Sequence, residues 1–412
     1  MHRPLRCCTL ALALAAPALA QPSGPPIRLV GYASGAASGP GSLQRQELCD
    51  PEVTVCAAGL PAAREVAGGA AYDPRTHALW HTDGAVIART GLVRCALECT
   101  FPATRSLGAG AVASGLALRT ASATLLQLET VAGTAALHAF DTAACPPAPI
   151  TTCRITLPSG RHHAGAAAVS EREGVGFVAT SIFDPQVANP ANTVLVLRLG
   201  AACTEVCRIA VANCGRFSLG PIRALAVDDC RRVLLVSDGI QIAVLDLSGD
   251  PCAPRPIACC SANAAGKTWH GFDVEARLPE PIGRPCSDGG CASCAQMRLL
   301  ADGAPAIGNR EFGVAIDGPP SGHGFVLLNF GRCIRQTVTG LCGPVLPALG
   351  PPPIGLATTP LVGSACQGRG ALSLPIPGDF RLCGGALCLQ GVVLCSSGGV
   401  ALTNGLQVIL GD

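Results

Sequence analysis

Few residues in this sequence have a spacing that could support chemistry. Cys286, Cys291 and Cys294 could hold zinc by their spacing, but no nearby histidine completes a set of four ligands. Gly108 and Gly110 lie in a Gly/Ala-rich turn that no helix pattern follows, so they lack the context of a dinucleotide site. The motifs of serine hydrolases, zinc proteases, calcium loops, P-loops and covalent haem attachment are absent from the sequence. We therefore predict no metal, no cofactor and no catalytic residue from these motifs.

A second group of polar residues is distributed along the chain, each member shortly before a strand of small apolar residues. The group comprises Arg64, Glu65, Arg161, His162, His163, Arg223, Trp269 and His270. In a ring of repeated sheets the segments that lead into the innermost strands meet at the mouth of the central channel, where ligands commonly bind. Imidazole and carboxylate suit a transition metal and arginine suits an anion, so the mixture favours an anionic or carbohydrate-like ligand over a metal. The alternative is that these loops are polar only because they meet water.

The elements that must position these residues recur along the chain. The segments GAAYDPRTHALWHTDG, from Gly69, and IRALAVDDCRRVLLVSDG, from Ile222, share a small apolar opening, a polar turn, an apolar strand and a final Asp-Gly turn. Looser copies begin near Gly115, Gly165 and Gly271. The unit recurs about every 45 to 60 residues, a period that fits one four-stranded propeller blade.

Five such openings predict an all-β fold with a small five-bladed propeller, with six blades as the alternative. The last opening, near Gly271 in the blade that begins near Trp269, has no cysteine-containing hairpin after it, whereas one such hairpin, around Cys49, precedes the first opening. We therefore expect residues 28 to 60 to supply the outer strands of the last blade and to close the ring across the termini.

Cysteines occur in the same phase as the repeat. Of 24 cysteines, Cys7 and Cys8 lie in the N-terminal leader and 22 remain, an even number that indicates a disulfide-bonded protein. Five close pairs fall between the end of one apolar strand and the start of another, so we predict that each pair staples a hairpin. These pairs are Cys49/Cys56, Cys95/Cys99, Cys145/Cys153, Cys203/Cys207 and Cys252/Cys259.

The two best copies of the repeat, at Gly69 and Ile222, resemble the repeats of secreted propellers of the NHL and YVTN type. The resemblance covers about 250 residues and rests on short, degenerate motifs. It implies a propeller fold, and it implies that Asp83 and Asp238 are structural turn residues.

After residue 284 the pattern changes to short strands separated by Gly and Pro turns, which predicts a C-terminal β-sandwich. This stretch resembles a module found at the C-terminus of uncharacterised secreted bacterial proteins, whose markers appear here in order as GN…F, PP…G, LPIP and LTNGL. The last marker departs slightly from its usual SNGL form. The resemblance implies fold and export, and no known chemistry.

The N-terminal segment and the composition indicate where the protein is located and which classes of partner it lacks. Residues 1–20 have a basic start, an apolar run and Ala18-Leu19-Ala20 at the end, which predicts a secretory signal peptide. Hydrophobic residues make up 49% and charged residues 14%, so the bulk of the chain should fold. The net charge of +2 and the lack of a basic block indicate no nucleic-acid partner, and no later stretch is long and apolar enough for a membrane span.

These patterns predict a signal peptide (1–20), a propeller (21–284) and a sandwich module (285–412). We expect a secreted protein, periplasmic or extracellular, without enzymatic activity, that binds an extracellular carbohydrate or protein or contributes to an envelope assembly. The alternative is a propeller hydrolase or lactonase with a site at the channel mouth. The apolar inner strands (GAAY, GLAL, GAAAV, ALAV) favour the first reading, because a metal-dependent lactonase needs several inward-facing Asp, Asn or Glu ligands.

Overall fold

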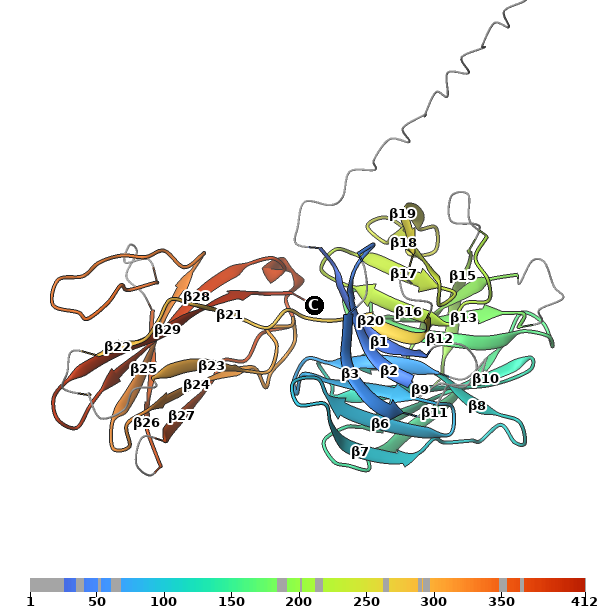
Figure 1. The fold of residues 1–412 in the computed structure, drawn as a ribbon. Coiled ribbons are helices and arrows are strands. Elements are labelled where there is room, and N and C mark those ends of the chain that lie inside the picture. Colours follow the sequence, from blue (N-terminus) through green and yellow to red (C-terminus); the bar gives the residue numbers. More distant parts are fainter. Residues whose placement is uncertain are drawn as a thin grey trace, which may run out of the picture.

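The fold is almost entirely β-structure, arranged as two parts that lie side by side (Figure 1). The computed structural model describes residues 26–34, 41–50, 53–60, 68–183, 191–200, 202–211, 218–261, 267–287, 291, 297–347, 354–363 and 367–411. The predicted signal peptide lies outside these residues. Within them the one helical element is a short 3₁₀ turn, η1 (Phe380–Leu382).

Five four-stranded antiparallel sheets form the blades of a propeller. Blade 1 contains β20 (Thr268–Val274), β1 (Arg28–Ser34), β2 (Gly41–Glu47) and β3 (Val53–Leu60). Blade 2 contains β4 (Gly69–Asp73), β5 (Ala78–Thr82), β6 (Val86–Gly91) and β7 (Ala96–Pro102). Blade 3 contains β8 (Val112–Arg119), β9 (Thr124–Val131), β10 (Thr134–Asp141) and β11 (Ala148–Thr156). Blade 4 contains β12 (His163–Ser170), β13 (Val175–Ser181), β14 (Thr193–Arg198) and β15 (Thr204–Ala210), and blade 5 contains β16 (Ala224–Asp228), β17 (Val233–Ser237), β18 (Gln241–Asp246) and β19 (Arg255–Ser261).

The ring closes by combining the two ends of the propeller sequence in blade 1. The innermost strand of that blade, β20, comes from the end of the repeat region, and its neighbour β1 comes from the beginning. Leu29 opposes Val274 and Tyr32 opposes Gly271 in this antiparallel pair. The predicted closure and the predicted five blades are therefore confirmed.

The innermost strands approach one another so closely that several of their positions have no room for a side chain. Each of β4, β8, β12, β16 and β20 packs beside two of the others, which makes a closed cycle at the axis. A Cβ added to Gly271 would lie 2.4 Å from the backbone nitrogen of Ala70, and one added to Gly115 would lie 2.8 Å from that of Ala167. The glycines of the repeat openings therefore bring the backbones of neighbouring blades into direct contact.

The Asp-Gly turns of blades 2 and 5 have the same structure. Asp83 Oδ1 accepts hydrogen bonds from the backbone N–H groups of Ala85 and Val86, and Asp238 Oδ1 accepts from the two residues at the same offsets in its own turn. Gly84 and Gly239 follow these aspartates with φ of 95°, a left-handed conformation that favours glycine. Both aspartates are thus turn residues.

Disulfides join each blade to the next around the outside of the propeller. In each bridge a cysteine on an outermost strand is bonded to a cysteine in the connection between the third and fourth strands of a neighbouring blade. The five bridges are Cys49–Cys260, Cys56–Cys95, Cys99–Cys145, Cys153–Cys203 and Cys207–Cys252. The bridges make a covalent ring that encloses all five blades.

The cysteines chosen from the sequence are disulfide-bonded, Cys259 included, but the predicted hairpin pairing is wrong. The strand register gives the reason, because the two members of each predicted pair do not oppose each other. Cys99 lies opposite Arg89, and Cys207 lies opposite Val196. The cysteines Cys49/Cys56, Cys95/Cys99, Cys145/Cys153, Cys203/Cys207 and Cys252/Cys259 therefore do not form bridges within their hairpins. The bonds that the structure contains run between adjacent blades.

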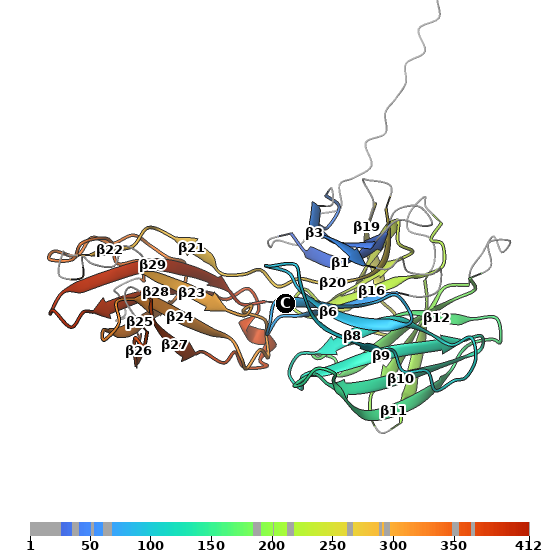
Figure 2. The same cartoon turned by 60° about the horizontal axis from the view of Figure 1, so that its bottom comes forward.

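The C-terminal part is a β-sandwich of two sheets. The larger contains β21 (Glu280–Ile282), β29 (Val400–Ile409), β28 (Ala386–Leu394), β25 (His323–Phe330) and β26 (Ile354–Pro360), with β22 (Cys286–Ser287) also paired to β29. The smaller contains β23 (Arg298–Asp302), β24 (Gly313–Gly318) and β27 (Gly368–Ser373). Figure 2 shows these strands apart from the blades. β21 pairs with β29, so residues 280–282 belong to the larger sheet of the C-terminal part. The domain limit after residue 284 stays a prediction.

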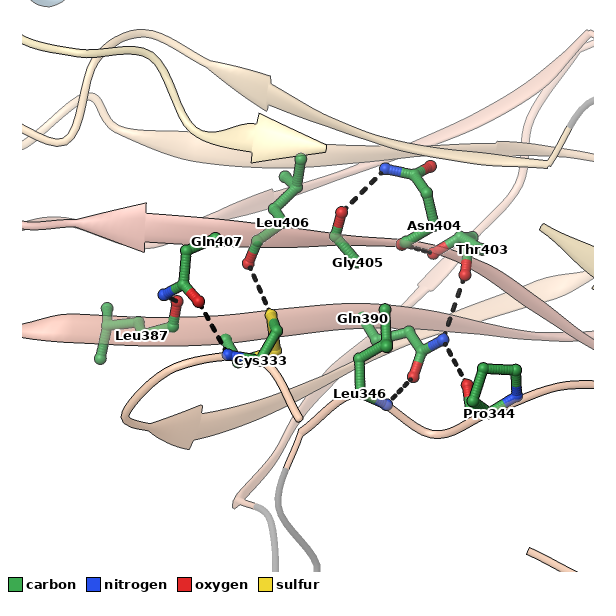
Figure 3. Close-up of a disulfide and its surroundings, with 11 residues drawn as sticks. Cys333, Pro344, Leu346, Leu387, Gln390, Thr403, Asn404, Gly405, Leu406 and Gln407 are labelled. Atoms are coloured by element: carbon green, nitrogen blue, oxygen red, sulfur yellow. Dashed lines mark hydrogen bonds between the residues drawn. A yellow bond between two sulfur atoms is a disulfide. The ribbon is translucent and has the colours of Figure 1, made fainter. Parts of the chain in front are cut away.

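Polar side chains and a disulfide fix the loops of the sandwich to its larger sheet (Figure 3). The Gln390 amide binds the backbone of Leu346, Pro344 and Thr403 at 2.9 to 3.2 Å. Cys333 is bonded to Cys388 of β28, and its N–H donates to the Gln407 side chain at 2.7 Å. These contacts hold the loop after β25 against β28 and β29.

We expect the ring of disulfides to supply much of the stability of the propeller. The Cys207–Cys252 bridge closes a loop with a sequence separation of 45 residues. The chain-entropy estimate for that length is about 4 kcal/mol. The double variant Cys207→Ser/Cys252→Ser should therefore lower the free energy of unfolding by about 2–5 kcal/mol in denaturant titration. The exposed variant Arg208→Ser is the control, and equal stability of the double variant and the control would contradict the contribution of the ring.

The close packing of the inner-strand glycines leads to a second prediction about stability. Gly271→Ala forces a methyl group against the backbone of blade 2, so it should cost about 1–3 kcal/mol or prevent folding. Gly160→Ala is the matched control, because no atom lies within 4 Å of a Cβ at that position. Thermal unfolding of both variants measures the difference. A Gly271→Ala protein as stable as Gly160→Ala would show that the blades do not meet at the axis as described.

Candidate functional site

The predicted channel-mouth residues lie on three blades, and part of the set cannot be placed. Arg64 and Glu65 lie outside the described residues. Arg161 is exposed in the turn before β12, and Arg223 is half-buried directly before β16. Trp269 is buried in the core between blades 5 and 1, where its ring packs edge-on against Phe272 at 5.9 Å.

The two adjacent histidines differ in their surroundings. His162 is buried, its Nδ1 binds the Ser159 hydroxyl at 2.8 Å, and its Nε2 lies 3.2 Å from the Ala191 carbonyl oxygen. Both ring nitrogens of His162 are therefore used within the protein. His163 is half-buried beside the ring of Phe183, and burial together with the neighbouring His162 lowers its pKa.

His270 has the arrangement most suited to function in this set. Its Nε2 shares a hydrogen bond of 2.6 Å with the Ser34 hydroxyl, and both residues are buried. Its Nδ1 is buried and has no hydrogen-bond partner among the described residues. Burial and the charge of Arg223 lower the pKa of His270 to about 4, so the imidazole is neutral at pH 7. The charge of Arg223 thus acts on His270 although 47 positions separate the two residues in the sequence.

Sequence reasoning missed two neighbours of His270, Ser34 and Tyr32, and a buried histidine beyond Tyr32. The ring of Tyr32 lies 5.8 Å from that of His270 and stacks at 5.7 Å on His81, whose Nε2 is 3.1 Å from the Thr90 hydroxyl. Burial lowers the pKa of His81 to about 4. Ser34 and Tyr32 belong to β1, which joins this blade only through ring closure. The closure prediction was the one signal that could have placed them beside His270.

The opposite end of the channel holds a cavity of about 90 Å³ that the sequence did not suggest. Inner strands of the propeller line it, and the C-terminal part covers it with Ala306, Ile307 and Phe380. Cys230 is bonded to Cys383, and the Arg172 guanidinium lies 5.7 Å from the Phe380 ring centre. The C-terminal part is therefore covalently attached at this end of the channel.

Three carboxyl groups line this cavity, and each makes hydrogen bonds between blades. Asp273 accepts from the Tyr72 N–H at 2.9 Å, Glu171 from the Ala121 N–H at 2.9 Å, and Asp229 from the Glu171 N–H at 2.8 Å. Burial raises the pKa of Asp273 to about 7 and that of Asp229 to about 6, and it also raises the pKa of Glu171. Mutual repulsion adds to the first two shifts. The three carboxyl groups thus connect neighbouring blades. No cluster of three or more side chains that could bind a metal ion occurs in the described ranges.

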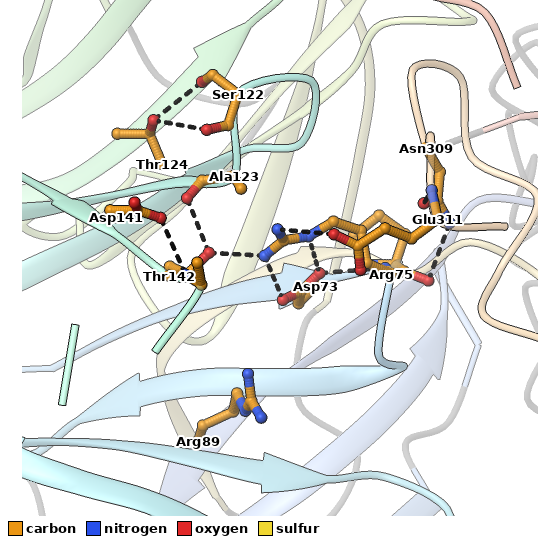
Figure 4. Close-up of polar contacts among 12 residues, drawn as sticks. Asp73, Arg75, Arg89, Ser122, Ala123, Thr124, Asp141, Thr142, Asn309 and Glu311 are labelled. Atoms are coloured by element: carbon orange, nitrogen blue, oxygen red, sulfur yellow. Dashed lines mark hydrogen bonds and ion pairs between the residues drawn. The ribbon is translucent and has the colours of Figure 1, made fainter. Parts of the chain in front are cut away.

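A buried arginine connects the propeller to the C-terminal part near this cavity (Figure 4). Arg75 binds Asp73 of its own blade at 2.8 Å and the Thr142 hydroxyl of blade 3 at 2.7 Å, and it lies 3.7 Å from Glu311 of the C-terminal part. Asn309 donates to the Pro74 carbonyl oxygen in the same turn at 3.4 Å. The turn at Pro74 and Arg75 is thus a contact point for two blades and the sandwich.

Comparisons with known proteins yield structural matches alone. No family model and no curated protein matches the sequence. Similar solved structures include an exo-β-1,3-galactanase from Phanerochaete chrysosporium, with 11% identity over 92% of this chain and 95% of that one and a TM-score of 0.38. They also include the Swd1 β-propeller domain from Myceliophteria thermophila (11%, 90% and 92%, 0.31) and glutaminyl cyclase from Myxococcus xanthus (12%, 70% and 92%, 0.32). In the described part of the chain, no helix has the length and apolarity needed to cross a membrane.

The buried carboxyls predict that stability depends on pH. The pKa of Asp273 in the folded protein is raised above the usual value. The stability that its protonated carboxyl group contributes is therefore fully present below about pH 4 and is lost as the pH rises through about 7. Asp273→Asn mimics the protonated group, so the variant should gain stability relative to the wild type between pH 5 and pH 8. Denaturant titration at both values measures this change, and Asp302→Asn is the exposed control. A difference between Asp273→Asn and the wild type that stays constant from pH 5 to pH 8 would contradict the prediction.

Proposed function

We propose that the protein is a secreted, non-enzymatic binding protein of the periplasm or the extracellular space. In this proposal an NHL- or YVTN-type propeller (21–284) presents the binding site, and a module typical of uncharacterised secreted bacterial proteins (285–412) is attached to it. The numerous disulfides support an oxidising compartment, and the leader at residues 1–20 supports export. The net charge of +2 favours partners other than nucleic acid.

The observation that carries the proposal is the environment of His270. A buried polar atom without a partner costs about 1–3 kcal/mol, and a bound ligand can recover that energy by supplying the missing hydrogen bond. The Arg223 guanidinium, which acts on His270 electrostatically, adds a permanent positive charge. A neutral imidazole beside a guanidinium suits a ligand that has a carboxylate and a hydroxyl group. We therefore propose an anionic sugar, or a protein that carries one, as the ligand.

One contact favours the alternative of a hydrolase. The 2.6 Å hydrogen bond between the Ser34 hydroxyl and a neutral imidazole is the arrangement of a nucleophile and its general base. A hydrolase of this type usually has a third group that orients the second ring nitrogen, and His270 Nδ1 has no such partner among the described residues. This difference makes binding the better supported of the two functions.

Titration calorimetry with glucuronate, and with glucose as the uncharged match, tests the proposal. We expect the wild type to bind glucuronate more tightly than glucose, and Arg223→Gln and His270→Ala each to weaken glucuronate binding at least tenfold. Removing Arg223 loses the charge attraction, whereas removing His270 loses a hydrogen bond. Arg154→Gln, which removes an exposed arginine of β11, is the control and should bind as the wild type does.

Two results would contradict the proposal. Equal affinity of the wild type, Arg223→Gln and His270→Ala for the probe, or no binding at all, would exclude this site for an anionic sugar. Labelling of the wild type by a fluorophosphonate, with loss of labelling in Ser34→Ala, would instead support the hydrolase. Circular dichroism of each variant confirms that a loss of binding is not a loss of fold.

A further inference from the structure

The core between blades 3 and 4 differs in composition from the other four cores between blades. Each of the others contains at least one buried aromatic side chain. These are Tyr32 and Tyr72 between blades 1 and 2, Trp80, Phe101 and Phe140 between blades 2 and 3, Phe177 between blades 4 and 5, and Trp269 and Phe272 between blades 5 and 1. The described core between blades 3 and 4 consists of Ala, Leu, Ile and Val, with two partly buried cysteines at its edge.

A groove occupies the place where this core lacks bulk. It has a volume of about 220 Å³, and its walls include Leu126, Leu137, Ala139, Ile150 and Leu199. The two cysteines of a bridge between blades also line it. An apolar cavity of about 150 Å³ in another protein remains dry and binds benzene, so this groove is large enough for an aromatic ring or a short aliphatic chain. Its apolar walls favour a ligand with such a group over water.

Arg119 is the one charged residue among the described walls of the groove, so the polar end of a ligand is expected to lie beside it. Arg119, at the end of β8, is exposed, and its charge reaches the carboxyl group of Glu171, which is directed to the backbone N–H of Ala121. Within the described ranges, the Arg119 guanidinium forms no hydrogen bond or ion pair with an acidic side chain. The guanidinium is therefore able to bind an anion at the edge of the apolar groove.

We propose that the groove between blades 3 and 4 binds a small anionic amphiphile, a carboxylate with an aromatic or short aliphatic tail. The tail fills the volume that an aromatic side chain fills between the other blades, and the carboxylate binds Arg119. This site is separate from the channel mouth and does not depend on the function proposed for His270 and Arg223.

Titration calorimetry with 3-phenylpropionate, and with 3-phenylpropan-1-ol as the uncharged match, tests this inference. We expect the wild type to bind both compounds and to prefer the carboxylate. Arg119→Gln should weaken carboxylate binding at least fivefold and leave alcohol binding unchanged, because only the charge contact is lost. Arg154→Gln, on the outer strand of the same blade, is the cation control.

Filling the groove tests the apolar part of the site. Ala139→Phe should abolish binding of both compounds and raise the melting temperature, since it supplies the missing bulk from within. If that variant does not fold, Ile150→Glu serves instead, because Ile150 is 57% exposed and a carboxylate there repels the ligand without entering the core. Retained carboxylate binding in the filled or charged variant would overturn the proposal, as would absence of binding to the wild type. A dimer that Ile150→Glu dissociates would assign the groove to a second copy of the chain and would overturn it as well.

Discussion

The direct contact of inner-strand backbones at the propeller axis is the constraint on which the rest of the structure depends. Five strands can meet around an axis only if the facing positions are very small, and Gly69, Gly115 and Gly271 meet that condition. A larger residue at any of them would force neighbouring blades apart. The small openings of the sequence repeat are thus the part of each unit that touches the next unit.

Two sets of bonds between blades work together with this contact. Near one end of the channel, Asp273, Glu171 and Asp229 accept hydrogen bonds from the backbone of a neighbouring blade. Around the outside, five disulfides join each outermost strand to the next blade. The chain ends meet in blade 1, where β1 pairs with β20, so backbone, side-chain and covalent bonds all contribute to closing the ring. The C-terminal sandwich covers the acidic end with Ala306, Ile307 and Phe380.

The sequence predicted the fold well because its signals are local and repeated. One small opening occurs in each blade, as at Gly69, Gly115 and Gly271, and the position of residues 28 to 60 before the first opening indicated the closure. Disulfide pairing was not predictable in this way, because the partner of Cys207 depends on which side of β15 faces the next blade. Cys203 directly precedes β15, which contains Cys207, so the two cysteines follow each other along one strand and do not oppose each other across a hairpin.

The site was predicted in part for a related reason. His270 was predicted because it precedes the opening at Gly271, and it lies within the inner strand β20, whereas Ser34 and Tyr32 reach it only through the closed ring, at a sequence separation of 236 for the Ser34 contact. The sequence analysis did not select the carboxyl groups of the covered cavity, although Glu171, Asp229 and Asp273 each fall near the end of an inner strand. Their shared position in the repeat was the available signal, and their raised pKa values depend on burial that no local pattern reveals.

Peptide mapping without reduction is the measurement that tests the ring most directly. Proteolysis under conditions that prevent disulfide exchange, followed by mass spectrometry, identifies which cysteine-containing peptides remain linked. The ring predicts that the peptide with Cys153 is linked to the one with Cys203, and that the peptide with Cys207 is linked to the one with Cys252. Linkage of Cys203 to Cys207, or of Cys145 to Cys153, would contradict the ring and would restore pairing within each hairpin.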